Sequence, residues 1–390
     1  MQNLQLTAIT IPSSLKSIQG SALSGNQIAN LVIPASVNQI NQGALSNCFV
    51  NIQVESGNGN YTAINNTCLL NSSNELIAGS INLTEIPDGI KSIGQGAFTN
   101  CSNLQSISIP SSVKSIGVQA FQSCSNLNSV TLSEGLQYIE QQAFNNCRNL
   151  HDITIPTTVS TIDKNAFNGV GQNGSNFTLN ILYTKSFDSN IWGTGSTSTY
   201  AITRFYVAPN KQYTTFACSK DIDFTESGLK AYIASGYDGS NHTVSLTEVS
   251  SAQAGEGIVI KAPSFDGTKY YLNSTTASSD GTNLLKGVTA DTNINATEGS
   301  NTNFILVNQT FNKLTGAGTL ANGKAYLQLP TAAARAKSLG ITTEGDVTGI
   351  INIDLDEEGD SMIYDLNGRR ISENATKGIY VKNGKKVIIK

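Results

Sequence analysis

Hydrophobic side chains recur at a fixed spacing through the first half of the chain. Leu104, Leu127 and Leu150 lie 23 residues apart, and further upstream Pro12 and Pro34 lie 22 apart. The same phase is shared by Ile107, Val130 and Ile153, by Val113, Leu136 and Val159, by Ile116, Ile139 and Ile162, and by the Ala-Phe pairs at 120–121, 143–144 and 166–167. A unit this short cannot bury its own apolar stripe, so the pattern predicts a solenoid of stacked coils.

Within each unit a short segment such as Leu104–Ile109 alternates apolar and polar residues, which predicts one strand of a parallel sheet. The apolar spacing of three and four residues that an amphipathic helix needs is not sustained. The period breaks between Pro34 and Pro87. There the sequence predicts two strands, Cys68–Leu70 and Glu75–Ala78, joined by a turn.

From about residue 205 the period is lost, and short strand-like runs alternate with turn dipeptides such as Asp238-Gly239 and Asn322-Gly323. This spacing predicts an all-β, sandwich-like domain, with one short helix over Thr331–Leu339. The last residues are richer in charge, and Asn367-Gly368 and Asn383-Gly384 predict hairpin turns. We therefore expect three parts: a repeat solenoid with its C-terminal cap at 1–204, an all-β domain at 205–345, and a C-terminal β-hairpin segment at 346–390.

Composition narrows the function classes. Only 13% of the 390 residues are charged and the net charge is −4, which excludes a nucleic-acid binder driven by a basic field. No apolar run reaches the ~18–20 residues of a membrane-spanning helix, so no transmembrane segment is predicted. The abundant uncharged polar residues favour an extracellular or outer-membrane surface location over a cytosolic one. Met1–Leu4 has neither a basic nor an apolar signal region, so we expect a signal peptide to be absent from this sequence.

The unit LxxIxIPxxVxxIxxxAFxxCxN resembles the BspA-like leucine-rich repeats of surface proteins from Bacteroides-type bacteria. The resemblance covers residues 1 to about 185 and includes an irregular coil, where Tyr61-Thr-Ala-Ile-Asn65-Asn-Thr-Cys-Leu69-Leu70 is similar to a hairpin variant of that family. It implies a mainly β fold built on a leucine-rich-repeat solenoid, and adhesion to host matrix or to other cells. The C-terminal run IYDLNGRRIS…KGIYVKNGKKVIIK resembles the conserved tail of Bacteroidetes surface and secreted proteins.

The outward positions of the predicted parallel strands form our candidate ligand-binding surface. A row of small polar groups on a solenoid can hydrogen-bond a protein or a glycan, although it can also be merely soluble. The candidate residues are Gln105, Ser106, Ser108, Asn128, Ser129, Thr131, His151, Asp152 and Thr154.

The cysteines give no metal site. Cys48, Cys101, Cys124 and Cys147 share one repeat phase, which places them in a line, whereas a tetrahedral zinc site needs four converging ligands. We expect a ladder of buried thiols. A Cys101–Cys124 disulfide is the alternative, because stacked coils bring such residues within reach of one another.

Four other motifs favour structural interpretations. Gly169–Gly174 spells GxGxxG but precedes an apparent strand at Phe177–Leu182 instead of a helix, so it is expected to be a loop. His151-Asp152 has no recognisable nucleophile, and Trp192 is expected at a domain junction. The run Asp354–Asp365 matches a calcium loop only in part, so an acidic turn is expected.

No catalytic set, metal site or cofactor site can be assembled from these residues. We therefore predict a non-catalytic, adhesin-like surface or secreted protein that binds a protein partner, such as a host matrix or cell-surface protein, through its repeat sheet. The alternative is a glycan-binding accessory protein that uses the 205–345 domain. Glycan sites usually need aromatic platforms, and aromatic residues are only 7% of the chain, which favours protein binding.

Overall fold

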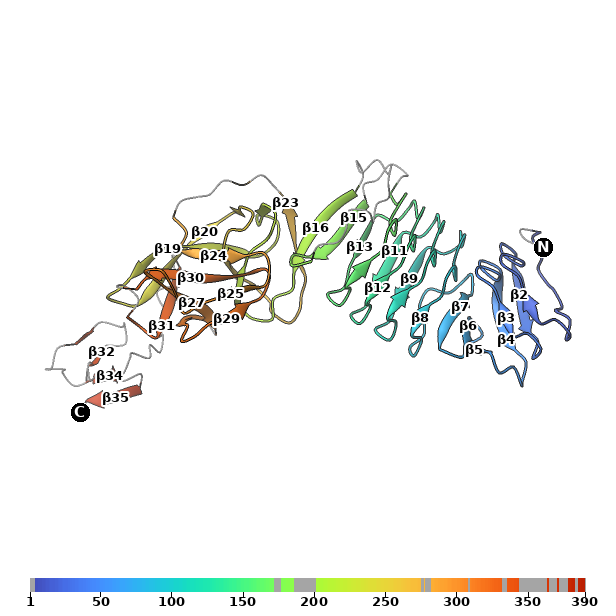
Figure 1. Ribbon diagram of the computed structural model, residues 1–390, viewed down its shortest axis with the longest axis horizontal. Coiled ribbons are helices and arrows are strands. Elements are labelled where there is room, and N and C mark those ends of the chain that lie inside the picture. Colours follow the sequence, from blue (N-terminus) through green and yellow to red (C-terminus); the bar gives the residue numbers. More distant parts are fainter. Residues whose placement is uncertain are drawn as a thin grey trace. The chain divides into compact units, whose positions relative to one another are not determined.

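The computed structural model describes residues 4–171, 177–185, 201–274, 277, 282–307, 309–331, 335–343, 363–364, 370–371, 378–382 and 385–389 (Figure 1). For 201–203 and for the strands from residue 363 onward only the backbone is described. The chain forms two compact units, Met1–Arg204 and Phe205–Lys390. The boundary expected near residue 345 stays a prediction.

The first unit is a β-solenoid, as the sequence predicts. Its strands are β1 (Ser17–Ile18), β2 (Ile28–Ile33), β3 (Gln39–Ile40), β4 (Phe49–Val54), β5 (Tyr61–Ile64), β6 (Cys68–Asn71), β7 (Glu75–Gly79), β8 (Ser92–Ile93), β9 (Ser106–Ile109), β10 (Ser115–Ile116), β11 (Ser129–Leu132), β12 (Tyr138–Ile139), β13 (Asp152–Thr154), β14 (Thr161–Ile162) and β15 (Phe177–Leu182). The longer strands pair in parallel as β2 with β4, β9 with β11, and β13 with β15. The two-residue strands β8, β10, β12 and β14 form a second parallel sheet, in which each coil meets the next at the same repeat phase.

The third side of each regular coil is a turn segment that contains an Ala-Phe pair, or Ala-Leu at 22–23 and 44–45. Four phenylalanines from successive turns stack with their rings nearly parallel, at centroid distances of 5.0, 5.2 and 5.5 Å for Phe98, Phe121, Phe144 and Phe167. The backbone of the turns is also joined from coil to coil, since the Phe121 amide donates to the Ala143 carbonyl at 2.8 Å. Apolar ladders and backbone hydrogen bonds therefore hold the coils together on the same side.

One position in each turn takes a left-handed backbone conformation. Gln119, Gln142 and Asn165 have φ values of 58°, 57° and 60°, and Gly96 occupies the same phase at 68°. Asn and Gly adopt this conformation more readily than other residues. The coils keep this turn geometry although the side chain varies.

The irregular coil carries the predicted hairpin. Strands β6 and β7 confirm the strands expected at Cys68–Leu70 and Glu75–Ala78, and β5 is a third strand that the sequence analysis missed. These strands extend the sheet of two-residue strands, because β7 pairs in parallel with β8. At the outer strand, the Ile40 amide donates to the Tyr61 hydroxyl at 2.8 Å, which ties the hairpin to β3.

The second unit is all β in its described part, and its first strand, β16, begins before the boundary at Phe205. Its strands are β16 (Ala201–Val207), β17 (Tyr213–Phe216), β18 (Ile222–Asp223), β19 (Lys230–Asp238), β20 (Thr243–Val249), β21 (Ser251–Ala252), β22 (Ile258–Lys261), β23 (Tyr270–Ser274), β24 (Leu285–Val288), β25 (Thr292–Ile294), β26 (Thr297–Glu298), β27 (Asn301–Val307), β28 (Thr310–Lys313), β29 (Gly318–Leu320), β30 (Lys324–Pro330), β31 (Ser338–Thr343), β32 (Ile363–Tyr364), β33 (Arg370–Ile371), β34 (Gly378–Lys382) and β35 (Lys385–Ile389). Strands β32–β35 make a small antiparallel sheet, as the turns at Asn367-Gly368 and Asn383-Gly384 predict.

The main sheet of this unit is nearly closed. It runs in the order β17-β22-β19-β20-β31-β28-β27-β30-β24, with β26 added to β27. A bridge between Glu256 and Lys286 joins the segment before β22 to β24. Buried Phe304, Phe311 and Leu327 lie in its hydrophobic core.

The helix predicted over Thr331–Leu339 is wrong where the structure describes it. Ser338 and Leu339 belong to β31, which pairs with β20 on one side and β28 on the other. At Ser338 and Leu339, backbone pairing with Asn312 and Phe311 of β28 outweighs the local helix propensity. The described residues contain no helix long and apolar enough to cross a bilayer.

Candidate functional site

The nine candidate residues come together on one side of the solenoid, which we call the polar face. In the parallel pair of β9 and β11, Ser106 lies opposite Ser129 and Ser108 lies opposite Thr131. Asn128 is held beside the preceding coil, because its amide donates to the Gln105 carbonyl at 2.9 Å. All nine residues are exposed or half-buried, and they are Gln105, Ser106, Ser108, Asn128, Ser129, Thr131, His151, Asp152 and Thr154.

The opposite faces of the same strands keep the polar face in place. Ile107, Val130 and Ile153 point into the solenoid and are at least nine-tenths buried. The period-two alternation of a strand then forces their neighbours outward. The polar face is therefore a direct consequence of the repeat phase. Each coil presents its polar groups at the same position along its strand.

The polar face continues upstream through residues from the irregular part of the stack. Glu85 forms a parallel bridge with Ser108, and the Ser108 amide donates to the Thr84 carbonyl at 2.9 Å. On β2 and β4, Asn51 Nδ2 donates to Asn30 Oδ1 at 3.2 Å. The analysis of the sequence missed Asn51, whose coil lies outside the regular period.

The chemistry of this surface is that of hydrogen bonding. Hydroxyl and amide groups dominate it, while His151 and Asp152 are both exposed and adjacent in sequence. Within the described ranges, no three His, Cys, Asp or Glu side chains gather closely enough to hold a metal ion. The side of the two-residue strands differs, because Lys91 and Lys114 stand exposed on it at one repeat phase.

The cysteine ladder is buried and reduced. All six cysteines are free, so the alternative Cys101–Cys124 disulfide is not formed. Cys124 Sγ donates to the Phe98 carbonyl at 3.1 Å, and Cys147 Sγ donates to the Phe121 carbonyl at 3.0 Å. Burial raises the pKa of Cys48 to about 12 and raises the pKa values of Cys101 and Cys124. These thiols fill the interior and stay protonated at neutral pH.

The remaining motifs add no site. Gly169 and Gly171 lie in the last turn of the solenoid, and the strand expected after them is β15, so the nucleotide-binding context of a strand followed by a helix is missing. Trp192 and the acidic residues of the run Asp354–Asp365 fall outside the described residues.

The comparisons decide the identity of the solenoid. A family model described as "BspA type Leucine rich repeat region" matches residues 1–78 and 77–191, with six copies. Residues 1–191 are a BspA-type leucine-rich-repeat domain. This confirms the resemblance drawn from the repeat unit. No curated protein matches the chain.

Three solved structures are similar to this BspA-type domain. A "leucine rich cell surface protein" from Faecalibacterium prausnitzii is 30% identical over 45% of this chain and 47% of its own, with a TM-score of 0.38. A leucine-rich repeat protein from Bacteroides capillosus is 28% identical over 31% of this chain and 94% of its own, with a TM-score of 0.24. The pneumococcal vaccine antigen PcpA is 22% identical over 43% of this chain, with a TM-score of 0.38. The chain spans less than half of the length of PcpA and of the Faecalibacterium protein, at 42% and 47%.

Proposed function

We propose that this chain is a non-catalytic surface or secreted protein whose BspA-type domain binds a protein partner through the polar face, as an adhesin does. The observation that supports this is the register of β9 and β11, which sets Ser106 beside Ser129 and Ser108 beside Thr131. Repeat arrays use such extended, regular surfaces for recognition. A row of short neutral side chains on paired backbone is rigid and loses little conformational entropy on binding.

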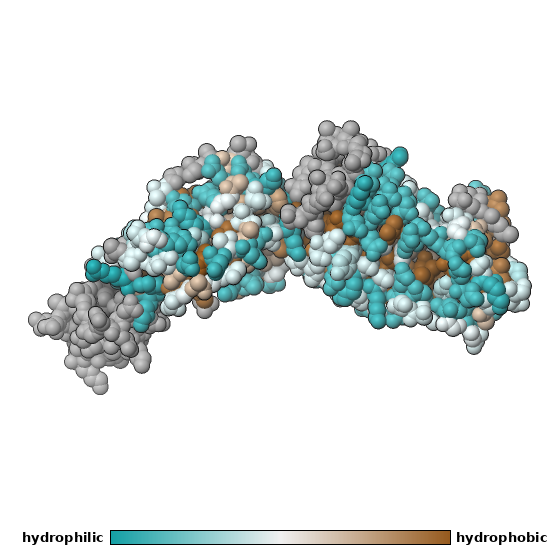
Figure 2. Space-filling view, viewed as in Figure 1, coloured by the Kyte–Doolittle hydropathy of each residue, from teal (hydrophilic) through white to brown (hydrophobic). Residues whose placement is uncertain are grey.

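The polar face fits a protein surface better than a small molecule. It is open, it extends over several coils, and its groups donate and accept hydrogen bonds without a strong charge of either sign. Figure 2 shows a mainly hydrophilic surface with only small hydrophobic spots over the repeat domain on the side in view. We therefore propose that recognition is built from many hydrogen bonds, some of them through bridging water, with few apolar anchors.

The test places lysines on two sides of the solenoid. The full chain is probed for capture by immobilised fibronectin, laminin and collagen. The triple variant N128K/T131K/H151K adds three positive charges to the polar face. The control Q137K/S160K/T161K adds three at exposed positions on the side of the two-residue strands, where Lys91 and Lys114 already stand.

The proposal predicts that the first variant loses capture while the control keeps it. If both variants are captured like the parent chain, the polar face is not the binding surface. If no protein is captured and a glycan array responds instead, the protein-binding proposal fails.

A further inference from the structure

The irregular coil reaches only two of the three sides of the solenoid. Residues 49–80 supply β4 and the hairpin strands but no Ala-Phe turn. On the turn side, the segment Gly43–Cys48 therefore meets Gly96–Cys101 directly, a junction we call the splice. A side chain bridges the two turns here, since Ser46 Oγ donates to the Thr99 carbonyl at 2.5 Å. Gln42 Nε2 reaches further and donates to Gln119 Oε1 in the following turn at 2.9 Å.

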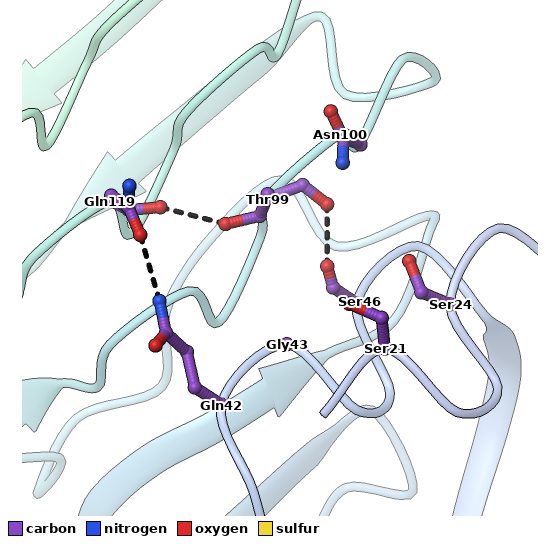
Figure 3. A pocket seen from close by; sticks show the side chains of 8 residues that line it. All are labelled: Ser21, Ser24, Gln42, Gly43, Ser46, Thr99, Asn100 and Gln119. Carbon is purple, nitrogen blue, oxygen red and sulfur yellow. Dashed lines mark hydrogen bonds between the residues drawn. The ribbon is translucent and has the colours of Figure 1, made fainter. Parts of the chain in front are cut away.

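The splice leaves a hollow of about 280 Å³ between the turns (Figure 3). It is lined by Ser21, Ser24, Gln42, Gly43, Ser46, Thr99, Asn100 and Gln119. None of these residues is charged and none is aromatic. Gly96 helps to keep it open, because a Cβ at this position would lie 3.0 Å from Cγ of Gln42 and 3.3 Å from Oγ1 of Thr99.

Ser24 and Asn100 supply a hydroxyl and a carboxamide to the lining of the hollow. Ser24 is only 4% exposed as a residue, whereas Asn100 is exposed. In Figure 3 both side chains project into the hollow from opposite turns. A hydroxyl and a carboxamide can each donate and accept hydrogen bonds with a ligand or water in the hollow.

We propose that the splice is a binding site for a neutral saccharide, either free or at the end of a glycan. Its lining of hydroxyls and carboxamides both donates and accepts, which matches the alternating donor and acceptor character of sugar hydroxyls. The absence of charge from the lining disfavours phosphates, carboxylates and metal ions. The volume lies just below the roughly 300–1,000 Å³ of small-molecule pockets, so it holds one sugar unit. This site is separate from the polar face and does not depend on its function.

Binding is expected to be weak, with a dissociation constant of roughly millimolar order, because no aromatic ring stacks on the sugar. The full chain is titrated with the methyl glycosides of glucose, galactose, mannose and N-acetylglucosamine, and binding is followed by saturation-transfer NMR. Methyl glucuronide is the charged counterpart. We expect saturable binding of at least one neutral glycoside and weaker binding of the glucuronide.

Variants then locate the binding. The pair S24A/N100G removes the hydroxyl and the carboxamide from the lining, and glycine suits position 100, whose φ is 61°. We expect this pair to weaken binding roughly tenfold. The matched control is S123G, at the equivalent turn position one coil further on with φ of 58°. It should bind like the parent chain.

A second variant guards against a folding defect. G96N places a side chain in the splice at the phase where the three following coils carry Gln119, Gln142 and Asn165, and it should block binding while leaving the melting temperature nearly unchanged. Three results would overturn the proposal. The proposal fails if no neutral glycoside binds at tens of millimolar, if S24A/N100G and G96N bind like the parent chain, or if the glucuronide binds best.

Discussion

Gln42 donates a hydrogen bond to Gln119, which lies 77 residues further along the chain. Gly96 lies in the coil between them, at the turn position that Gln119 holds in its own coil. A side-chain amide hydrogen bond of the same kind joins the next two coils, since Gln119 Nε2 donates to Gln142 Oε1 at 3.0 Å. The side chain of Gln42 extends past Gly96, which has none. This glycine therefore decides how the turn side closes over the irregular coil.

Position 96 should tolerate asparagine but not valine. Asn adopts the left-handed region readily, and Asn165 does so at the same phase, whereas a β-branched residue at φ of 68° is strained. We expect Gly96→Asn to change the free energy of unfolding by less than about 1 kcal/mol and Gly96→Val to lower it by about 1–3 kcal/mol. Urea denaturation measures both. Equal losses would show that space, and not backbone conformation, requires the glycine.

Gly79 at the end of β7 should not accept a side chain. A Cβ there would lie 2.3 Å from the ring of Phe98, the first phenylalanine of the stack. We expect Gly79→Ala to destabilise the repeat domain by about 1–3 kcal/mol through overpacking. Gly59→Ala is the control in the same coil, because nothing lies within 4 Å of its Cβ. Denaturation curves that coincide for the two variants would contradict this packing.

The phenylalanine stack should tolerate leucine better than alanine. Phe144 stacks on Phe121 and Phe167 at 5.2 and 5.5 Å, and Leu45 holds the same phase before the splice. We expect Phe144→Ala to cost about 3–5 kcal/mol and Phe144→Leu clearly less. Differential scanning calorimetry checks the order. A leucine variant as unstable as the alanine variant would mean that ring stacking, and not volume, stabilises this side.

Alkaline pH should destabilise the repeat domain. Burial raises the pKa of Cys48 to about 12 and that of Cys68 to about 11, from 9.0. Below pH 9 the thiols are protonated in both the folded and the unfolded chain. Above it only the unfolded chain ionises freely, so stability falls as the pH rises from 9 toward 12.

Melting temperatures between pH 7 and 11 measure this loss. The variant C48A should show a shallower decline than the parent chain, whatever its stability at pH 7. A decline of equal slope would mean that other groups, such as the buried tyrosines, cause it.

The repeat phase was enough to predict the solenoid and the polar face. Ile107, Val130 and Ile153 mark the inward positions, and strand alternation then places Ser106, Ser129 and Asp152 outside. Because the spacing acts along the whole stack, one residue per coil determines where its neighbours point.

The splice could not be predicted in this way. It depends on what residues 49–80 lack, a turn segment, and no pattern of hydrophobic positions shows which sides of a coil a hairpin covers. Similarly, the sequence around Ser338 and Leu339 predicts a helix, because the strand residues that pair with them, Asn312 and Phe311 of β28, lie more than 25 positions earlier in the chain. A local signal for the splice did exist, namely Gly96 at a phase where Gln119 and Gln142 carry long amides.

The most direct test attaches a polymer either to the polar face or to the side of the two-residue strands. The native cysteines are buried, so a cysteine introduced at Ser129 or at Gln137 is the reactive thiol of its variant. Each is coupled to polyethylene glycol through a reducible disulfide, and capture by the matrix protein identified in the screen is measured before and after reduction. The account predicts that the polymer at position 129 abolishes capture and that reduction restores it, while the polymer at 137 has little effect. Capture that survives modification at 129 but not at 137 would contradict it.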